Sequence, residues 1–240
     1  MRTLSSSPWL VLFAVLAASC ASPPPPLGAL PGEQVHTFVA IRTGPRTTPL
    51  AKAERGAMFQ GHFDNMNRLA RAGDLVMAGP YGKQKHANDL RGIFVLATAD
   101  AAVAKTLAET DPGFRQGEFR FEYTRIGTTA DLRAQLAADL AREDAIAASG
   151  KKPAPGDGGR AYVWLWVPDF FAASAAFADS PSVLLAARCD DGRGLFLLDA
   201  LDLAAAQALL APKQAQLGTC ELDEWFGSGL LVDLPKRSAR

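Results

Sequence analysis

The chain has 240 residues, of which 48% are hydrophobic and 21% charged, and its 25 basic residues balance 25 acidic ones. This is the composition of a globular protein, which excludes whole-chain disorder and a collagen-like fibre. The balanced charge argues against a protein that binds nucleic acid through bulk positive charge. At this length the chain forms one or two domains with a sizeable core.

Residues 1–19 have the pattern of a signal peptide. Arg2 supplies a positive charge, residues 9–16 form an apolar segment, and Ala17 to Ser19 are the small residues that a signal peptidase accepts. The apolar segment is too short to span a bilayer comfortably. We therefore expect this segment to direct export and to be removed.

The run from Leu16 to Cys20 resembles the lipobox of bacterial lipoproteins, in which the cysteine is lipidated and becomes the mature N-terminus. Ala17 departs from that motif, which usually carries Leu there, so cleavage without lipidation is the alternative. Residues 20–33 follow as a proline-rich tether. The resemblance implies a lipid anchor on Cys20 in the bacterial cell envelope, and Ala21 favours the outer membrane, with the protein facing the periplasm or the exterior.

Residues 34–128 predict strands and helices in the order β-α-β-β-α-β, which is a ferredoxin-like unit. Apolar or alternating runs predict strands at 37–42, 75–80, 92–97 and 119–126. A helix is expected within 50–73, and a second one begins at Asp100 and ends near residue 111. The buried face of the first helix is predicted to consist of Phe59, Phe63, Met66 and Ala70.

Residues 161–234 repeat much of this pattern. Strands are predicted at 162–167, 182–187, 194–199 and 221–226, with one helix over 202–210. A gap-free superposition places Phe94 on Phe196, Asp100 on Asp202 and Tyr123 on Trp225, which indicates a degenerate internal duplication. Most of the first helix is missing from this second copy, because few residues separate its first two strands.

Residues 129–160 separate the copies as a predicted helix over 131–149 followed by a Gly/Pro-rich linker, and 235–240 form a tail. Residues 34–128 hold 13 basic and 9 acidic residues, net +4, whereas 161–234 hold 3 and 10, net −7. Opposite charges favour docking of the halves; two unrelated solvated surfaces are the alternative. We expect an α+β fold in which two ferredoxin-like units form an intrachain pseudo-dimer, and hence a monomer or weak oligomer.

Cys189 and Cys220 are predicted to be free thiols. In a ferredoxin-like sheet they lie at opposite edges, roughly 14 Å apart at about 4.8 Å per strand, whereas a disulfide needs Cα atoms within about 7 Å. The spacing of the cysteines and of the three histidines offers no metal site, and no motif indicates a cofactor.

Over about residues 35–127, the strand order is accompanied by His62, the run Ala-Gly-Pro at 78–80 and the pair Asp111-Pro112. In these features the segment resembles the YCII-related family. Members of that family are ferredoxin-like, are similar to the dimeric α/β barrels in which two units pack sheet to sheet, and carry a His and an Asp proposed as an active-site pair. The resemblance implies that His62 and Asp111 are catalytic residues acting on a small molecule, which is aromatic for a few relatives.

The residues themselves leave two interpretations of His62 open. It lies about 60° from the apolar stripe of its helix, which suits a half-buried surface histidine as well as a residue facing a cleft. Asp111 is expected at the C-terminal end of its helix, where a carboxylate costs about 0.3–1 kcal/mol, close to the start of the first helix. A carboxylate bonded to an imidazole fixes its tautomer and favours its charged form. We expect general acid/base chemistry; a ligand-binding or structural envelope protein without catalysis is the alternative.

Other polar and aromatic residues are weaker candidates. Tyr81 and Arg91 lie near the Gly-Pro pair and are candidate binding residues for an anionic or aromatic ligand. His86 lies in a polar turn that is predicted to be a solvated hairpin loop. Trp164 and Trp166 share one strand face, which favours packing over ligand stacking.

Overall fold

The computed structural model describes residues 25–150, 159–178 and 180–234. This part of the chain is a mixed α+β fold whose eight strands form one antiparallel sheet in the order β2-β3-β1-β4-β6-β7-β5-β8. The strands are β1 (Gln34–Thr43), β2 (Leu75–Pro80), β3 (Leu90–Leu96), β4 (Phe119–Thr128), β5 (Arg160–Val167), β6 (Val183–Cys189), β7 (Gly194–Leu198) and β8 (Glu221–Gly227). The predicted signal peptide, Cys20, most of the linker and the tail lie outside the described residues.

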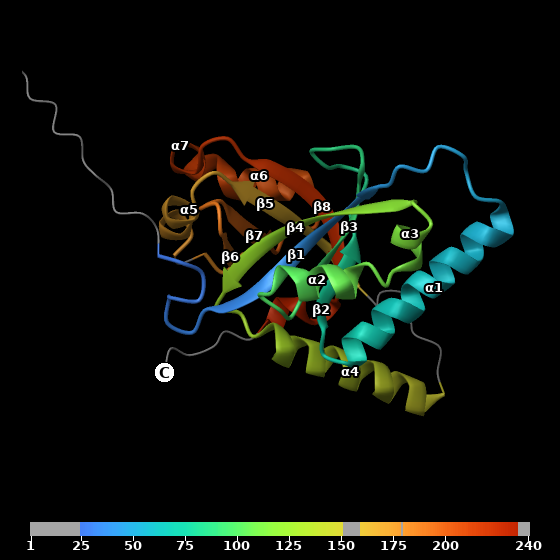
Figure 1. Cartoon of the computed structure of the whole chain (residues 1–240). Helices are drawn as coiled ribbons and strands as arrows, with labels where there is room; N and C mark the ends of the chain where they lie inside the picture. The colour runs from blue at the N-terminus through green and yellow to red at the C-terminus, as the bar shows by residue number, and fades with distance from the viewer. Residues whose placement is uncertain (1–24, 151–158, 179, 235–240) are drawn as a thin grey trace, which may run out of the picture.

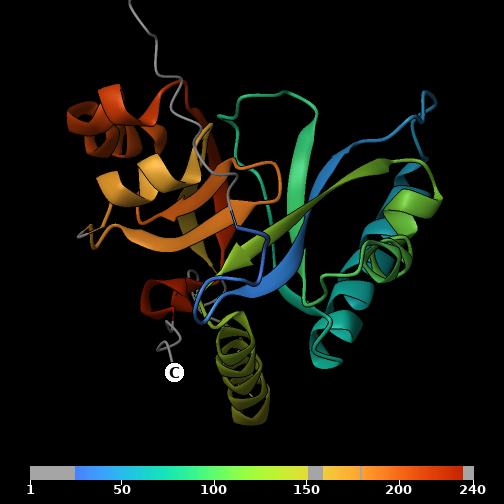
Figure 2. The same ribbon diagram turned by 60° about the vertical axis from the view of Figure 1, so that its left-hand side comes forward.

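Helices cover the outer face of the sheet in two groups (Figures 1 and 2). The first four strands carry α1 (Lys52–Arg71), α2 (Ala101–Ala108) and α3 (Pro112–Arg115), and the last four carry α5 (Phe170–Ala176), α6 (Leu203–Leu210) and α7 (Gln214–Leu217). The helix α4 (Leu132–Ser149) lies at one end of the sheet. All predicted strands and helices are confirmed to within a few residues, and α5 is indeed short. No helix in the described ranges combines the length and apolar character needed to cross a membrane.

Aspartate N-caps explain where several helices begin. The Asp100 carboxylate accepts hydrogen bonds from two amides in the first turn of α2, and the Asp202 carboxylate accepts one from the Ala205 amide of α6. Each carboxylate satisfies backbone donors that have no partner within the helix. Each of these two residues therefore caps the helix that follows the third strand of its half.

The predicted gap-free superposition is wrong at the last strand. Val39 of β1 pairs with Phe94 and Tyr123, and in the second half Leu165 pairs with Phe196 and Leu222. Leu222, rather than Trp225, is thus the counterpart of Tyr123. The shift is three residues, because 29 positions separate Phe94 from Tyr123 whereas 26 separate Phe196 from Leu222. An odd shift places side chains on opposite faces of a sheet, so Tyr123 faces the helices and Trp225 the interior.

The two halves of the sheet meet along two seams. Strands β4 and β6 pair directly, and the edge strands β2 and β8 approach through a bridge between Tyr81 and Trp225. The Gly82 amide also donates to the Glu224 carbonyl at 2.7 Å. A Cβ atom on Gly79 would lie 2.0 Å from the Phe226 carbonyl oxygen, so the second seam requires glycine there. The curved sheet consequently has its two edges in contact (Figure 2).

The largest hydrophobic cluster lies between the halves, and two smaller ones lie under the two groups of helices. Phe38 of β1 contacts both Trp164 and Trp166 of β5 edge to face, with ring centroids 5.9 and 5.5 Å apart. The prediction that these tryptophans serve packing between the halves is confirmed. Edge-to-face pairs are a favourable geometry for aromatic rings.

Both predicted free thiols are confirmed. Cys189 ends β6 and Cys220 precedes β8, and these strands are separated by β7 and β5. Burial raises the pKa of the Cys189 thiol to about 12 and also raises that of Cys220. Such thiols are poor nucleophiles at neutral pH.

The described end of the proline-rich segment is held against the second half. The guanidinium of Arg188 on β6 donates to the Glu33 carboxylate at 3.0 Å and to the carbonyl groups of Pro25 and Pro26. The side chains of Arg188 and Glu33 are 3% and 2% exposed. Within the predicted tether, therefore, residues 25–33 form part of the folded domain. We call Arg188 and Glu33 the N-terminal clamp.

His36 on β1 is a buried histidine whose two ring nitrogens lack a hydrogen-bond partner among the described residues. Burial and, to a smaller extent, the nearby Arg133 charge lower the pKa of His36 from 6.5 to about 4, although the Leu96 backbone and Asp131 oppose the change. Between about pH 4 and pH 6.5, therefore, the His36 imidazole is mostly neutral in the folded protein and mostly protonated in the unfolded chain.

We predict that acid destabilises the protein through His36. Between pH 6.5 and about 4 the unfolded state binds more protons at this residue, so the free energy of unfolding falls as the pH falls through that window. At about 1.4 kcal/mol per pKa unit, the free energy of unfolding changes by up to ~3 kcal/mol across this pH range. Urea unfolding at pH 7 and pH 4.5 of the wild type and of His36→Phe tests this. The variant should lose most of the difference, and equal pH dependence in both proteins would refute the prediction.

Candidate functional site

His62 and Asp111 form a buried hydrogen-bonded pair. The Nδ1 atom of His62 lies 2.6 Å from Oδ2 of Asp111, and the two side chains are 11% and 0% exposed. The buried stripe of α1 is Met58, His62, Asn65 and Leu69, whereas Phe59 and Phe63 are 39% and 57% exposed. The predicted buried face is therefore wrong: the buried stripe is displaced by one residue along α1. This orientation of the helix places His62 against the Asp111 carboxylate.

The predicted position of Asp111 at a helix C-terminus is also wrong. The helix α2 ends at Ala108, and Asp111 is the N-cap of the short helix α3, where its Oδ1 atom accepts from the Gly113 amide at 2.8 Å. Pro112 occupies the first position of α3, where a proline ring suits the backbone. The Asp111 carboxylate thus bonds both the Gly113 amide and the His62 imidazole. As an N-cap it stabilises α3, so an aspartate is favourable at this position.

A second polar link runs beside this pair. The Asn65 side-chain oxygen accepts from Thr110 Oγ1 at 3.0 Å and from Arg68 Nη2 at 2.8 Å. Asn65 lies one helical turn after His62, and Thr110 directly precedes Asp111. Neither residue was predicted from the sequence, although the three-residue spacing places Asn65 on the same helix face as His62. The two links fix α1 against the turn that carries Asp111.

Four phenylalanine rings surround the imidazole. Phe94 of β3 stacks on it with ring centroids 5.9 Å apart, and Phe119 and Phe63 lie at 5.5 and 5.4 Å. Phe59 completes the set at 6.4 Å. Apolar walls reduce water around the pair and strengthen its electrostatic interactions.

The second ring nitrogen of His62 is free to act on another molecule. Among the described residues Nε2 makes no hydrogen bond, and it is not one of the buried polar atoms without a partner. With the side chain 11% exposed, Nε2 therefore keeps some contact with solvent. A histidine held by a carboxylate at Nδ1 and open at Nε2 can donate or accept a proton.

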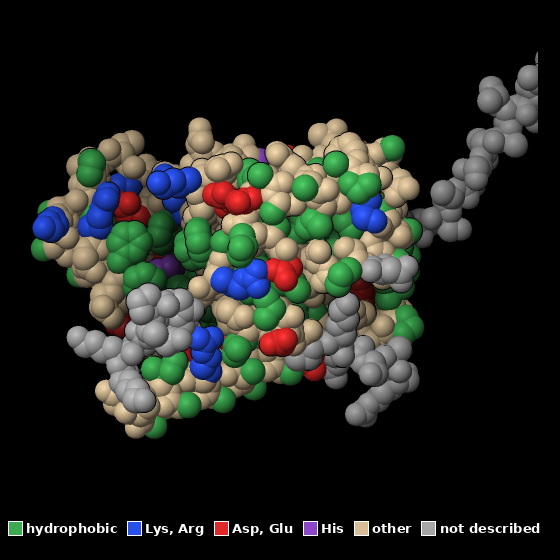
Figure 3. Space-filling model, turned by 180° about the vertical axis from the view of Figure 1, so that it is seen from behind, with side chains coloured by type: hydrophobic (Ala, Val, Ile, Leu, Met, Phe, Trp, Pro, Cys, Tyr) green, Lys and Arg blue, Asp and Glu red, His purple; other side chains and the backbone are tan. Residues whose placement is uncertain are grey.

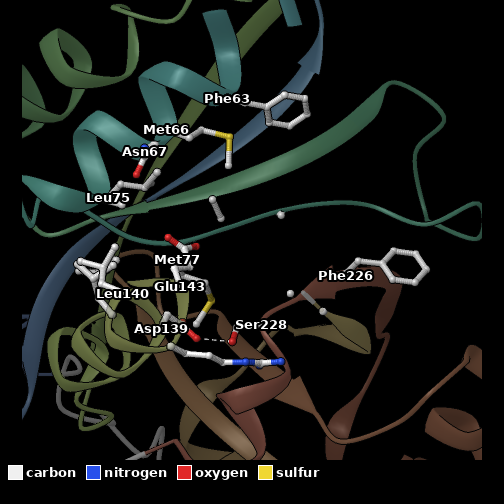
Figure 4. Close-up of a pocket in the computed structure, with 18 of the residues that line it drawn as sticks. Phe63, Met66, Asn67, Leu75, Met77, Asp139, Leu140, Glu143, Phe226 and Ser228 are labelled. Atoms are coloured by element: carbon white, nitrogen blue, oxygen red, sulfur yellow. Dashed lines mark hydrogen bonds between the residues drawn. The ribbon is translucent and has the colours of Figure 1, made fainter. Parts of the chain in front are cut away.

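A large cavity lies on the adjacent flank of α1, and neither His62 nor Asp111 lines it. It has a volume of about 860 Å³ and lies between α1, β2, α4 and the end of β8 (Figure 4). Hydrophobic side chains gather around hollows on this side of the molecule (Figure 3). The smaller cavity, of about 320 Å³, lies at residues 45–48 and 116–117.

The other sequence-predicted residues lie along the second seam. Tyr81 is buried in the central core, and Arg91 is exposed, so the two meet only through a backbone hydrogen bond of 3.0 Å. Neither residue lines a described cavity, and their ligand-binding role stays a prediction.

The predicted solvated loop around His86 instead contacts the second half. His86 Nδ1 lies 2.8 Å from the fully buried Asp223 carboxylate of β8, and Nε2 lies 3.4 Å from Glu221. Burial raises the pKa of Asp223, and bonds from His86 oppose this. The pair thus ties a basic loop of the first half to acidic residues of the second, as the charge imbalance suggested.

Comparisons with family models, curated proteins and solved structures return no match to this chain. The YCII-related resemblance consequently stays a hypothesis based on the motif residues. Within the described ranges no group of three or more His, Cys, Asp or Glu side chains is arranged to hold a metal ion.

Proposed function

We propose that this protein catalyses proton transfer on a small molecule, with His62 as general acid or base and Asp111 as the residue that orients it. The 2.6 Å contact between His62 Nδ1 and the buried Asp111 carboxylate carries the proposal. A carboxylate at Nδ1 fixes the tautomer in which Nε2 accepts a proton, and it stabilises the imidazolium that results. The phenylalanine walls suit a compact apolar or aromatic substrate.

The arrangement of the sheet supports a second part of the proposal, namely two ferredoxin-like units in an intrachain pseudo-dimer. The orders β2-β3-β1-β4 and β6-β7-β5-β8 are the same when each half is numbered separately. The seams join the fourth strand of each half to the second strand of the other. Because only the first half has a long first helix, only it can present a histidine such as His62, in keeping with a YCII-like unit beside a degenerate copy.

Proton exchange into carbon acids tests catalysis without knowledge of the natural substrate. Incubation in D₂O with a panel of small aromatic and aliphatic carbonyl compounds, followed by mass spectrometry, should reveal deuterium incorporation by the wild type. His62→Gln should slow it about 10²- to 10⁴-fold. His86→Gln is the matched control, because His86 also pairs with a buried aspartate, and it should keep full activity.

A non-catalytic binding protein is the second candidate function. It is favoured by one observation: His62 lines neither cavity, and the larger one is a separate apolar site. If the wild type exchanges no compound faster than His62→Gln, acid/base catalysis is refuted and the binding function takes its place.

We also propose that the protein is attached to the cell envelope through a lipid on Cys20. The lipobox-like run before Cys20 and the proline-rich residues after it support this. We predict that Cys20→Ser abolishes lipidation and moves the protein from the membrane to the soluble fraction. Fractionation and metabolic labelling with an alkyne fatty acid measure this, and unchanged membrane association of the variant would contradict it.

A further inference from the structure

We propose that the cavity between α1, β2, α4 and the end of β8 binds a neutral, mostly apolar small molecule, a role distinct from proton transfer at His62. We call this cavity the apolar groove. Its volume of about 860 Å³ lies within the range of roughly 300–1,000 Å³ typical of small-molecule sites. Residues of α1, β2, α4 and the end of β8, together with Gly159 before β5, form it (Figure 4).

The walls of the apolar groove are hydrophobic and adaptable. They include Phe63, Met66 and Ala70 of α1, Leu75 to Ala78 of β2, and Leu136, Leu140 and Ile146 of α4. Met66 and Met77 carry flexible, polarisable side chains that adjust to ligands of different shape. The α1 residues are those whose spacing predicted a buried face. Phe63, Met66 and Ala70 of this stripe thus line a solvent-accessible groove, and Met66 also packs against the hydrophobic cluster under the helices.

Two large aromatic side chains at the groove are exposed without a ligand. Phe63 on α1 is 57% exposed and Phe226 on β8 is 47% exposed, and they belong to opposite walls (Figure 4). Exposed apolar surface that borders a cavity commonly marks a binding site. A bound molecule would remove part of both rings from water.

The polar lining groups select against a charged, anionic ligand. Asp139 accepts hydrogen bonds from Ser228 and Gln135, and Asn67 accepts one from Arg71, so these oxygens already have partners. Asp139 and Glu143 are the two acidic lining residues, against one basic residue, Arg142. Recognition therefore rests on apolar contact, and an anion would be repelled.

Fluorescence titration with N-phenyl-1-naphthylamine, a neutral apolar probe, tests the proposal on the exported full chain. We expect saturable binding at one site with a micromolar Kd. Phe63→Ser combined with Phe226→Ser should weaken binding at least tenfold. Leu201→Ser removes an equally exposed apolar residue, 63% exposed and outside the groove, and should leave the Kd unchanged. The anionic probe 1-anilinonaphthalene-8-sulfonate should bind at least tenfold more weakly.

The methionines locate the probe directly. Met66 and Met77 line the groove, whereas Met58 is buried on another face of α1. In NMR spectra of protein labelled at the methionine methyl groups, the probe should shift Met66 and Met77 and leave Met58 unchanged. His62→Gln should bind the probe like the wild type, so failure of catalysis and failure of groove binding remain distinguishable.

Several outcomes would overturn the proposal. Non-saturable binding, equal loss in Leu201→Ser, or equal affinity for the anionic probe would each do so. Shifts of Met66 and Met77 with protein concentration, together with faster sedimentation, would assign the groove to a second copy of the chain. If the probe binds only after residues 151–158 are replaced by a Gly-Ser segment of equal length, the apolar groove would be assigned as the binding site of residues 151–158.

Discussion

Asp111→Ala should abolish proton exchange and also lower the free energy of unfolding by about 2–4 kcal/mol. The substitution removes the N-cap of α3 and leaves the Gly113 amide and the His62 imidazole without a partner in a buried site. Loss of a cap costs roughly 1 kcal/mol, and each buried polar group left without a partner adds about 1–3 kcal/mol. Urea unfolding and the deuterium exchange assay measure the two effects.

Asp111→Asn separates the two roles of this carboxylate. Asparagine caps a helix about as well as aspartate, so we expect α3 to form and the loss of stability to be at most half that of Asp111→Ala. The negative charge beside the imidazole is lost, so activity should still fall strongly. Ring ¹⁵N shifts of His62 should report a changed tautomer or protonation. Full activity in Asp111→Asn would show that Asp111 has a structural role only.

Arg188→Met should lower the free energy of unfolding by about 3–5 kcal/mol and the Tm by about 10 °C. The substitution leaves the Glu33 carboxylate buried, and within the described part of the chain its remaining donors are the amides of Gly28 and Leu30. It also removes the hydrogen bonds to the Pro25 and Pro26 carbonyls. Because Arg188 lies on β6 and Glu33 precedes β1, the loss should loosen the N-terminal segment and the seam between β4 and β6 together.

An exposed ion pair provides the control for the N-terminal clamp. Arg71 and Asp144 lie 2.9 Å apart with side chains 47% and 63% exposed. Exposed ion pairs contribute little to stability because water screens their charges, so Arg71→Met should change the Tm little. In Arg188→Met combined with Glu33→Gln no unpaired charge stays buried, and the double variant should be more stable than the sum of the single effects predicts. Similar losses for the buried and the exposed pair would contradict the role of the clamp.

Most of the secondary structure followed from local signals. Strands with apolar or alternating residues and helices that begin at aspartate caps were predictable because these patterns act within a few residues. The separation of the two cysteines was also predictable, since it depends only on the strand order within one half. Asp111 could be named from its motif, but its place at the start of α3 could not, because a four-residue helix has no periodic pattern.

The sequence by itself determined the order of strands and helices, the repeated pattern of the halves and the two residues of the candidate pair. The tertiary structure alone decided which face of α1 is buried, because both Met58/His62 and Phe59/Phe63 offer apolar stripes and only packing chooses between them. It also decided that His86 meets Asp223, that Arg188 holds Glu33 and that α4 completes the apolar groove. The residues of the first two contacts lie 137 and 155 positions apart in the sequence. Local sequence propensities do not determine such long-range contacts, which form because the two halves pack against each other.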